Sequence, residues 1–186
     1  MLVWKTYFGT APYEYAYPLV LQTLSEKIAT DVPNVSGTHA PMNQLANLTL
    51  APLSAGYGPN ADTLYSFGWL DLSKEPIVLH VPNTNGRFYS FELIDAWTNA
   101  FTVIGQRTTG TAEGDYAIVG PNWTGTLPAG VTEVQSPTDL VQFIGRTLVY
   151  GQGDVPAATA MQQQYSLTPL SDYGTAYTPP TNVPTG

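Results

Sequence analysis

The segment Thr63-Leu64-Tyr65-Ser66-Phe67-Gly68-Trp69-Leu70 indicates the fold class of this chain. Its aromatic residues occupy alternate positions, so Tyr65, Phe67 and Trp69 would share one face of an extended strand. A hydrophobic period of two predicts a β-strand, whereas a helix would repeat every 3.6 residues. Similar segments follow as far as residue 150, and the chain is therefore predicted to be mostly β.

Seven strands are predicted in this region, with turn-forming residues between them. They are Thr63–Leu70, Ile77–Val81, Arg87–Asp95, Thr98–Gln106, Asp115–Val119, Val131–Gln135 and Phe143–Tyr150. The pair Asn85-Gly86 is a strong signal for a hairpin between the second and third strands. The number and spacing of the strands predict an antiparallel, immunoglobulin-like β-sandwich, with a jelly roll or an open barrel as the alternative.

Helical additions are predicted near both ends of the chain. Apolar residues recur at helical spacing within residues 11–30, and Asp154 is placed to cap a helix from Val155 to Tyr165. A short helix is also considered at Met42–Leu48, and a capped helical turn at Ser136–Asp139. The predicted organisation is an N-terminal arm, helix and long connection (1–60), a sandwich core with the C-terminal helix (61–171), and a Pro- and Thr-rich tail or linker (172–186).

Composition excludes several classes of function. Only 11% of the residues are Asp, Glu, Lys or Arg, and the formal net charge is −8. The 6 Lys and Arg residues are too few for a groove that follows phosphates, so neither nucleic acid nor an anionic membrane surface is an expected partner. The absence of cysteine excludes disulfides, thiolate metal sites and cysteine nucleophiles.

Composition also bears on where the protein acts. Its polar surface must come mainly from Thr, Ser, Asn, Gln and Tyr, and such an uncharged surface favours an extracellular or secreted protein. No apolar run is long enough to span a membrane, and insertion into a membrane is not expected. Met1–Tyr7 lacks a signal-peptide pattern, so either a signal has been removed or the protein stays inside the cell. Three sequons would accept glycans on a secretory route unless they arose by chance, at Asn34, Asn47 and Asn122.

The few charged residues of the strand region are the candidates for a functional site. For a hydrolase or lyase, the candidate catalytic residues are Asp62, Asp95, Arg87 and Arg107. For a carbohydrate-like or anionic ligand, the candidate binding residues are Arg87, Arg107, Arg146 and Trp123. Alternatively, each arginine holds loops together through backbone carbonyls and one carboxylate. Arg87 and Asp95 lie about 26 Å apart along one predicted strand, so each must find its partner elsewhere.

Other signatures of chemistry are weak. His39 and His80 are the only histidines, and a Ser-His-Asp triad would need one of them to lie beside a serine. No Gly-x-Ser-x-Gly elbow occurs, and His80 is interpreted as a core or edge residue. The histidines lack the spacing of a metal site, and no glycine loop of the Walker or dinucleotide type is present. Neither a metal nor a cofactor is therefore expected.

Aromatic residues divide into two groups by position. Trp69 and Trp97 are expected in the core, whereas Trp123 lies in a turn and is the better candidate for exposure. Aromatic residues near the two ends of the chain are candidates for docking terminal arms onto neighbouring copies, and they are Trp4, Tyr13, Tyr15, Tyr17, Tyr173 and Tyr177.

A series of short motifs resembles a known family. The motifs include Pro59-Asn-Ala-Asp-Thr-Leu-Tyr-Ser66, Gly86-Arg-Phe-Tyr89, Asp95-Ala-Trp-Thr-Asn99, Gly105-Gln-Arg-Thr-Thr-Gly110, Gly120-Pro-Asn-Trp123 and Gly145-Arg-Thr147. Their order is similar to that of the family called domain of unknown function 1254, from about Tyr15 to Tyr173. The resemblance implies a β-sandwich core and no assigned reaction. It also implies a second, jelly-roll-like domain after Pro179-Pro180, which was either removed or never present here.

Two functions are the expected alternatives. The first is a non-enzymatic extracellular module that assembles into homo-oligomers or binds a carbohydrate-like ligand. The second is a hydrolase or lyase domain that acts on a polar or sugar-like substrate. Scarce charge, a surface rich in Thr and Tyr, and the lack of a recognisable catalytic set favour the first.

Overall fold

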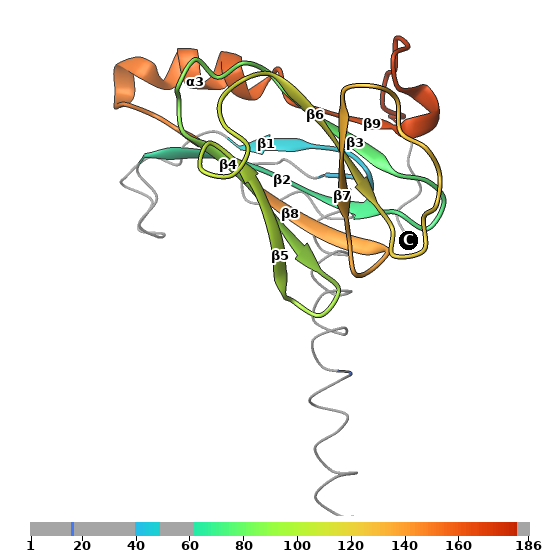
Figure 1. The fold of residues 1–186 in the computed structure, drawn as a ribbon. Coiled ribbons are helices and arrows are strands. Elements are labelled where there is room, and N and C mark those ends of the chain that lie inside the picture. Colours follow the sequence, from blue (N-terminus) through green and yellow to red (C-terminus); the bar gives the residue numbers. More distant parts are fainter. Residues whose placement is uncertain (1–15, 17–39, 49–61, 182–186) are drawn as a thin grey trace, which may run out of the picture.

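Two facing β-sheets form the body of the protein (Figure 1). The computed structural model describes Ala16, residues 40–48 and residues 62–181. The first sheet has the order β1-β2-β8-β4-β5 and the second has the order β7-β6-β3-β9. The strands are β1 (Ala46–Leu48), β2 (Thr63–Asp71), β3 (Ile77–Val81), β4 (Tyr89–Asp95), β5 (Ala100–Gly105), β6 (Gly114–Val119), β7 (Val131–Gln135), β8 (Leu140–Leu148) and β9 (Ser166–Pro169). The sheets do not close into a barrel, which confirms the prediction of a mostly β sandwich.

Alternation along the strands produces the core between the sheets. In β4, for example, Tyr89, Phe91 and Leu93 are buried, whereas Glu92 between them is exposed. Phe91 meets Tyr165 edge to face, with ring centroids 4.9 Å apart. The other buried members include Leu70, Ile77, Leu79, Val81, Ile104, Tyr116, Ile118, Val141, Phe143 and Leu167. Burial of this apolar set is the main force that holds the sheets together.

Two glycines allow aromatic rings to lie directly against the first sheet. A Cβ atom on Gly145 would stand 2.6 Å from the ring of Phe91. A Cβ atom on Gly68 would stand 2.6 Å from the ring of Phe143. Carbon atoms in contact normally lie 3.5–4.0 Å apart, so neither position has room for a side chain.

The structure corrects several predicted elements. Met42–Leu48 holds no helix but ends in β1, whose residues pair with β2. A segment this short gains little as a helix because nucleation is costly, whereas pairing with β2 satisfies its backbone. The strand β9 was not predicted, and Ser136–Asp139 forms bends without a helix. β6 and β7 run parallel, so the sandwich is mixed and not purely antiparallel.

The predicted hairpin at Asn85-Gly86 is also wrong. Both residues adopt positive φ angles, 50° and 83°, as expected for a tight turn. The flanking strands β3 and β4 nevertheless belong to different sheets, so the turn carries the chain from one sheet to the other. The local turn was therefore predictable, but the partner of the following strand was not.

One helix, α3 (Val155–Gln162), closes an end of the sandwich (Figure 1). Its buried Ala158 packs with Leu64 and Val149, the residues just inside β2 and just after β8. This confirms the predicted C-terminal helix, whereas the helix predicted within residues 11–30 lies outside the described residues. No helix in the described part of the chain is long and apolar enough to cross a membrane.

Candidate functional site

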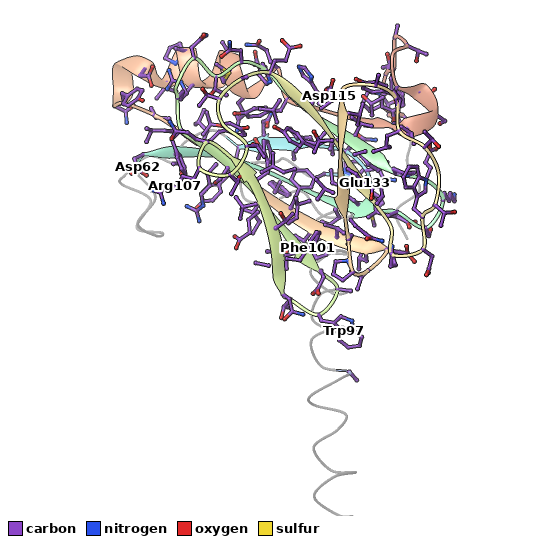
Figure 2. All side chains as sticks on the ribbon, in the orientation of Figure 1. Asp62, Trp97, Phe101, Arg107, Asp115 and Glu133 are labelled. Carbon is purple, nitrogen blue, oxygen red and sulfur yellow. The ribbon has the colours of Figure 1, made fainter. Side chains whose placement is uncertain are left out.

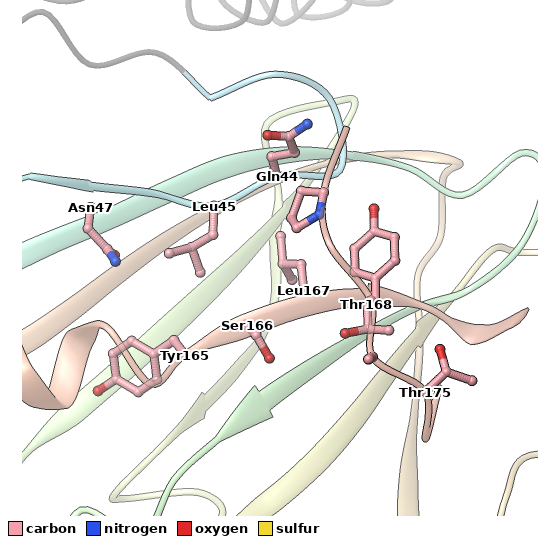
Figure 3. Close-up of a pocket in the computed structure, with 11 residues that line it drawn as sticks. Gln44, Leu45, Asn47, Tyr165, Ser166, Leu167, Thr168 and Thr175 are labelled. Atoms are coloured by element: carbon pink, nitrogen blue, oxygen red, sulfur yellow. The ribbon is translucent and has the colours of Figure 1, made fainter. Parts of the chain in front are cut away.

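A cavity of about 430 Å³ opens along one side of the sandwich (Figure 3). It lies between β1, the edge of the first sheet, and β9, the edge of the second. Three segments of the chain line it, the first far in sequence from the other two, and their residues are Gln44, Leu45, Asn47, Tyr165, Ser166, Leu167, Thr168, Thr175, Ala176, Tyr177 and Pro179. We call this space the edge cavity.

The chain that follows β9 forms the outer wall of the edge cavity. A 3₁₀ turn at Leu170–Asp172 reverses the chain after β9, and Ser171 donates from its backbone N to Glu75 at 2.8 Å. The segment 173–181, here called the C-terminal arm, then returns toward β1. Gln44 Nε2 donates to the carbonyl of Pro180 at 2.8 Å, and this bond ties the arm to the segment before β1.

The lining of the edge cavity is uncharged and mixes polar with apolar side chains. It combines amides and hydroxyls with two tyrosines and includes no Asp, Glu, Lys or Arg. Burial raises the pKa of Tyr165 to about 12, and its hydroxyl hydrogen-bonds Thr147 Oγ1 at 3.0 Å. Burial also raises the pKa of Tyr177, with the charges of Asp172 and Glu75 adding to the effect. Both phenols are therefore neutral at ordinary pH.

A buried network of polar side chains supports the floor of the cavity. Gln162, only 2% exposed, donates to the carbonyl of Tyr65 at 2.7 Å and to Ser66 Oγ at 3.2 Å. Ser66 donates in turn to Asn47 Oδ1 at 2.7 Å. Asn47 Nδ2 donates back to the carbonyl of Gln162 at 3.4 Å. The network fixes β1 against β2 and α3, and so fixes one lip of the cavity.

A row of three polar side chains crosses the second sheet beside the cavity. Pairing places Ser166 of β9, His80 of β3 and Asp115 of β6 directly opposite one another. His80 Nδ1 lies 2.8 Å from Asp115 Oδ1. Because a carboxylate only accepts hydrogen bonds, Nδ1 is the donor of this bond, and Nε2 is the other nitrogen of the ring. Tyr173 of the C-terminal arm donates to the other carboxylate oxygen at 2.8 Å.

This row was missed because its members are far apart in sequence. The strand period placed His80 opposite in phase to its apolar neighbours, which is correct. The serine beside it belongs to β9, which was not predicted. The alternation of Ser166, Leu167 and Thr168 is the one sequence signal for β9, and it is too short to indicate a strand by itself.

Arg87 forms a two-point ion pair with Asp154. Arg87 Nη1 donates to Asp154 Oδ2 at 2.5 Å, and Nη2 donates to Oδ1 at 2.8 Å. Asp154 also accepts from the backbone N of Tyr150, and Arg87 donates to the carbonyl of Leu148. The hydrogen bonds from Arg87 lower the pKa of Asp154 to about 2. Asp154 occupies the predicted N-cap position of α3, but its side chain makes no capping bond there.

The four candidate catalytic residues do not meet. Asp62 and Arg107 lie toward one end of the molecule, with Arg107 stacked 5.7 Å from the ring of Phe88 (Figure 2). Arg87 lies two residues before β4 and forms its ion pair with Asp154. Asp95 lies at the far end of β4, 4% exposed, and accepts from the backbone N of Trp97 and of Asn99. Asp95 thus stabilises the β4–β5 turn.

The remaining predicted ligand residues also have local partners. Arg146 stacks 4.6 Å from the ring centroid of Tyr65, on the face of the first sheet opposite the core. Trp123 is half-buried and packs on an apolar cluster that includes Val78 and Ala117. Trp97, expected in the core, is 40% exposed on the β4–β5 turn (Figure 2). Trp69 is buried at 1% exposure, as predicted.

Several predicted residues lie outside the described part of the chain. They are Trp4, Tyr13, Tyr15, Tyr17, Asn34 and His39. Tyr173 and Tyr177, also predicted for assembly, lie against the chain's own sandwich. In residues 40–48 and 62–181, no three His, Asp or Glu residues gather where they would hold a metal ion.

The sequence matches one family over most of these elements. The model of the family described as "Protein of unknown function (DUF1254)" matches residues 42–169, from the segment before β1 to the end of β9. The chain belongs to this family. The match confirms the resemblance found from the sequence motifs. No curated protein matches the chain.

Two solved structures are similar to this DUF1254 member. The VPA0106 protein from Vibrio parahaemolyticus is 26% identical, with a TM-score of 0.69 over 92% of this chain and 40% of that one. This chain therefore spans less than half the length of that relative. An uncharacterised protein from Burkholderia cenocepacia is 14% identical, with a TM-score of 0.40 over 57% of this chain and 31% of that one.

Proposed function

We propose that the protein is a non-enzymatic binding module and that its edge cavity takes a neutral, carbohydrate-like ligand. The observation that carries this proposal is the chemistry of the lining. Eleven residues surround the space, and all of them are uncharged. Amides and hydroxyls supply both donors and acceptors, which suits the hydroxyl groups of a sugar.

The size and the aromatic content of the edge cavity support the same ligand class. A volume of about 430 Å³ falls within the ordinary range of small-molecule sites. Tyr177, which is half-buried, supplies a flat, amphipathic ring, and such rings bind the apolar faces of sugars. An anionic ligand is disfavoured because the net charge is −8 and the lining offers no cation.

A screen of neutral oligosaccharides against the full chain tests this proposal. Binding detected by saturation-transfer NMR is expected to be lost in Tyr177→Ala and weakened in Gln44→Ala, because both residues line the cavity. Tyr150→Ala is the matched control, since Tyr150 is a tyrosine with 69% exposure outside this cavity. Equal binding by Tyr177→Ala and the wild type would contradict the site.

Self-assembly and an extracellular location belong to the same proposal. The uncharged surface and the scarcity of Lys and Arg support both. Native mass spectrometry of the gently isolated chain tests assembly, with homo-oligomers as the expected species. A strictly monomeric chain would exclude the assembling form and leave the ligand-binding form as the function.

A hydrolase is the second candidate, and the Ser166–His80–Asp115 row favours it. Directly opposed side chains have Cβ atoms about 5 Å apart, so Ser166 and His80 are neighbours on one face of the second sheet. In this reaction Ser166 Oγ attacks an ester carbonyl and passes its proton to Nε2. The alcohol leaves with that proton, and water then releases the acid and restores the serine.

Reaction with a fluorophosphonate probe separates the two candidates. The binding module is expected to remain unlabelled, whereas a hydrolase would be labelled at Ser166 in a manner that His80→Ala abolishes. Ser171→Ala is the control, because Ser171 is another exposed serine of the same region but bonds to Glu75. Labelling that Ser166→Ala removes and Ser171→Ala keeps would establish the hydrolase and exclude the non-enzymatic reading.

A further inference from the structure

Asn122 lies at an outward-facing position in the loop between β6 and β7. The middle of this loop packs on the outer face of the second sheet, where Trp123 and Leu127 contact a cluster that includes Val119. Asn122 and Thr124, on either side of Trp123, are both exposed. Trp123 between them is half-buried, so the two exposed residues flank a side chain that packs on the sheet.

The backbone holds Trp123 in this position. Its N donates to the carbonyl of Gly120 at 3.2 Å, which closes the turn containing Asn122. A Cβ atom on Gly125 would stand 2.5 Å from the Trp123 ring, so the ring rests directly on the backbone at residue 125. The sequon Asn122-Trp123-Thr124 is thus presented on a fixed loop with its amide and hydroxyl exposed.

Asn47 begins the only other sequon whose asparagine is described, and its setting is the opposite. It lies in β1 directly across from Ser66, and both atoms of its amide are engaged. Asn47 Oδ1 accepts from Ser66, and Nδ2 donates to the carbonyl of Gln162. Nδ2 is the atom to which a sugar would be attached, so a glycan there would displace the end of α3.

We propose that Asn122 is a site of N-linked glycosylation, an inference that rests on the extracellular location proposed above, and that Asn47 is not modified in the folded protein. A lipid-linked oligosaccharide is the donor class. A bond forms between Asn122 Nδ2 and the anomeric carbon of the sugar, while the bond from that carbon to the pyrophosphate oxygen breaks. The amide proton leaves with the pyrophosphate. Thr124 completes the sequon that the transferring enzyme reads.

Secretion of the full chain from eukaryotic cells tests this assignment. Peptide mapping after treatment with peptide N-glycosidase, which converts glycosylated Asn to Asp, is expected to find Asp at position 122 and Asn at 47. Asn122→Gln loses the glycan, and so does Thr124→Ala, which keeps the asparagine. Asn47→Gln keeps the glycan on Asn122. A reference glycoprotein secreted by the same cells confirms that donor and enzyme are active.

Two results would overturn the assignment. The first is that Asn122 carries no glycan in the secreted chain, although the reference protein secreted by the same cells is fully glycosylated. The second is a glycan on Asn47 in a chain that is still folded. Such a chain would elute as folded protein, and its unfolding temperature would equal or exceed that of the Asn47→Gln variant. Either would mean that exposure of the sequon in this fold does not decide where the sugar is attached.

Discussion

Arg87 and Asp154 are 67 residues apart in sequence, yet the Arg87 guanidinium contacts both carboxylate oxygens of Asp154. The pair joins the turn before β4 to the residue that precedes α3. Arg87 also donates to the carbonyl of Leu148 at the end of β8. One side chain therefore ties together the end of a strand, a loop and the start of a helix.

Acid is expected to weaken the fold through Asp154. Its pKa falls from the ordinary 3.8 to about 2 in the folded protein, mainly because of the hydrogen bonds from Arg87. The stabilisation is complete above the unfolded value and is lost as the pH falls from about 3.8 through about 2. Between pH 5 and pH 2, the midpoint temperature of thermal unfolding should fall more steeply with decreasing pH for the wild type than for Asp154→Asn. Parallel curves for the two proteins would contradict the pairing.

The close approach of Phe91 to Gly145 predicts a cost of adding one methyl group. Gly145→Ala should lower the free energy of unfolding by about 1–3 kcal/mol, because the ring must move or the strand must shift. Gly153→Ala is the matched control, since nothing lies within 4 Å of a Cβ atom there, and a change within about 0.5 kcal/mol is expected. Urea denaturation measures both. Equal stabilities would show that the ring is free to move away.

Loss of the Gln162 amide should destabilise the floor of the edge cavity. Gln162→Leu keeps the size of the side chain but leaves the carbonyl of Tyr65 without its 2.7 Å donor. An unsatisfied buried polar group costs about 1–3 kcal/mol, and urea denaturation should find a loss of that order. The adjacent Gln163 is exposed, and Gln163→Leu should leave stability nearly unchanged. An unchanged free energy of unfolding in Gln162→Leu would mean that the network does not contribute to stability.

Asp115 holds the C-terminal arm through Tyr173, and the phenol should report this contact. The hydrogen bond to Asp115, with burial and the carboxylate charge adding to it, raises the pKa of Tyr173. In Asp115→Asn the negative acceptor is gone, so Tyr173 should lose its proton at a lower pH than in the wild type. Absorbance titration follows the ionisation of the phenols, and the step that is missing in Tyr173→Phe belongs to Tyr173. An unchanged titration in Asp115→Asn would place the arm away from the sheet.

Most of the longer strands were predictable from the sequence, whereas the two shortest strands, β1 and β9, were not. Ile77–Val81 and Val131–Gln135 were predicted with the observed bounds because each is rich in β-branched residues and lies between turn-forming residues. β1 and β9 have only 3 and 4 residues, too few to display a period. They form through pairing with β2 and β3, which is a property of the assembled sandwich.

The edge cavity could not be predicted for the same reason. Its two lips are the unpredicted strands, and its outer wall is an arm that was interpreted as a linker. The charged residues chosen from the sequence instead find separate partners, such as Asp154 for Arg87 and the β4–β5 turn for Asp95. The candidate site residues were chosen because charged residues are few, but these residues stabilise the fold. The residues that line the cavity are uncharged.

Chemical-shift mapping is the most direct test of the binding module. Titration of the isotope-labelled full chain with a neutral oligosaccharide found in the screen should shift the backbone signals of Gln44, Tyr165 and Thr175, which line the edge cavity on three different segments. The shifts should saturate together and disappear in Tyr177→Ala. Saturable shifts confined to another surface, or none with any neutral sugar, would contradict the proposed function.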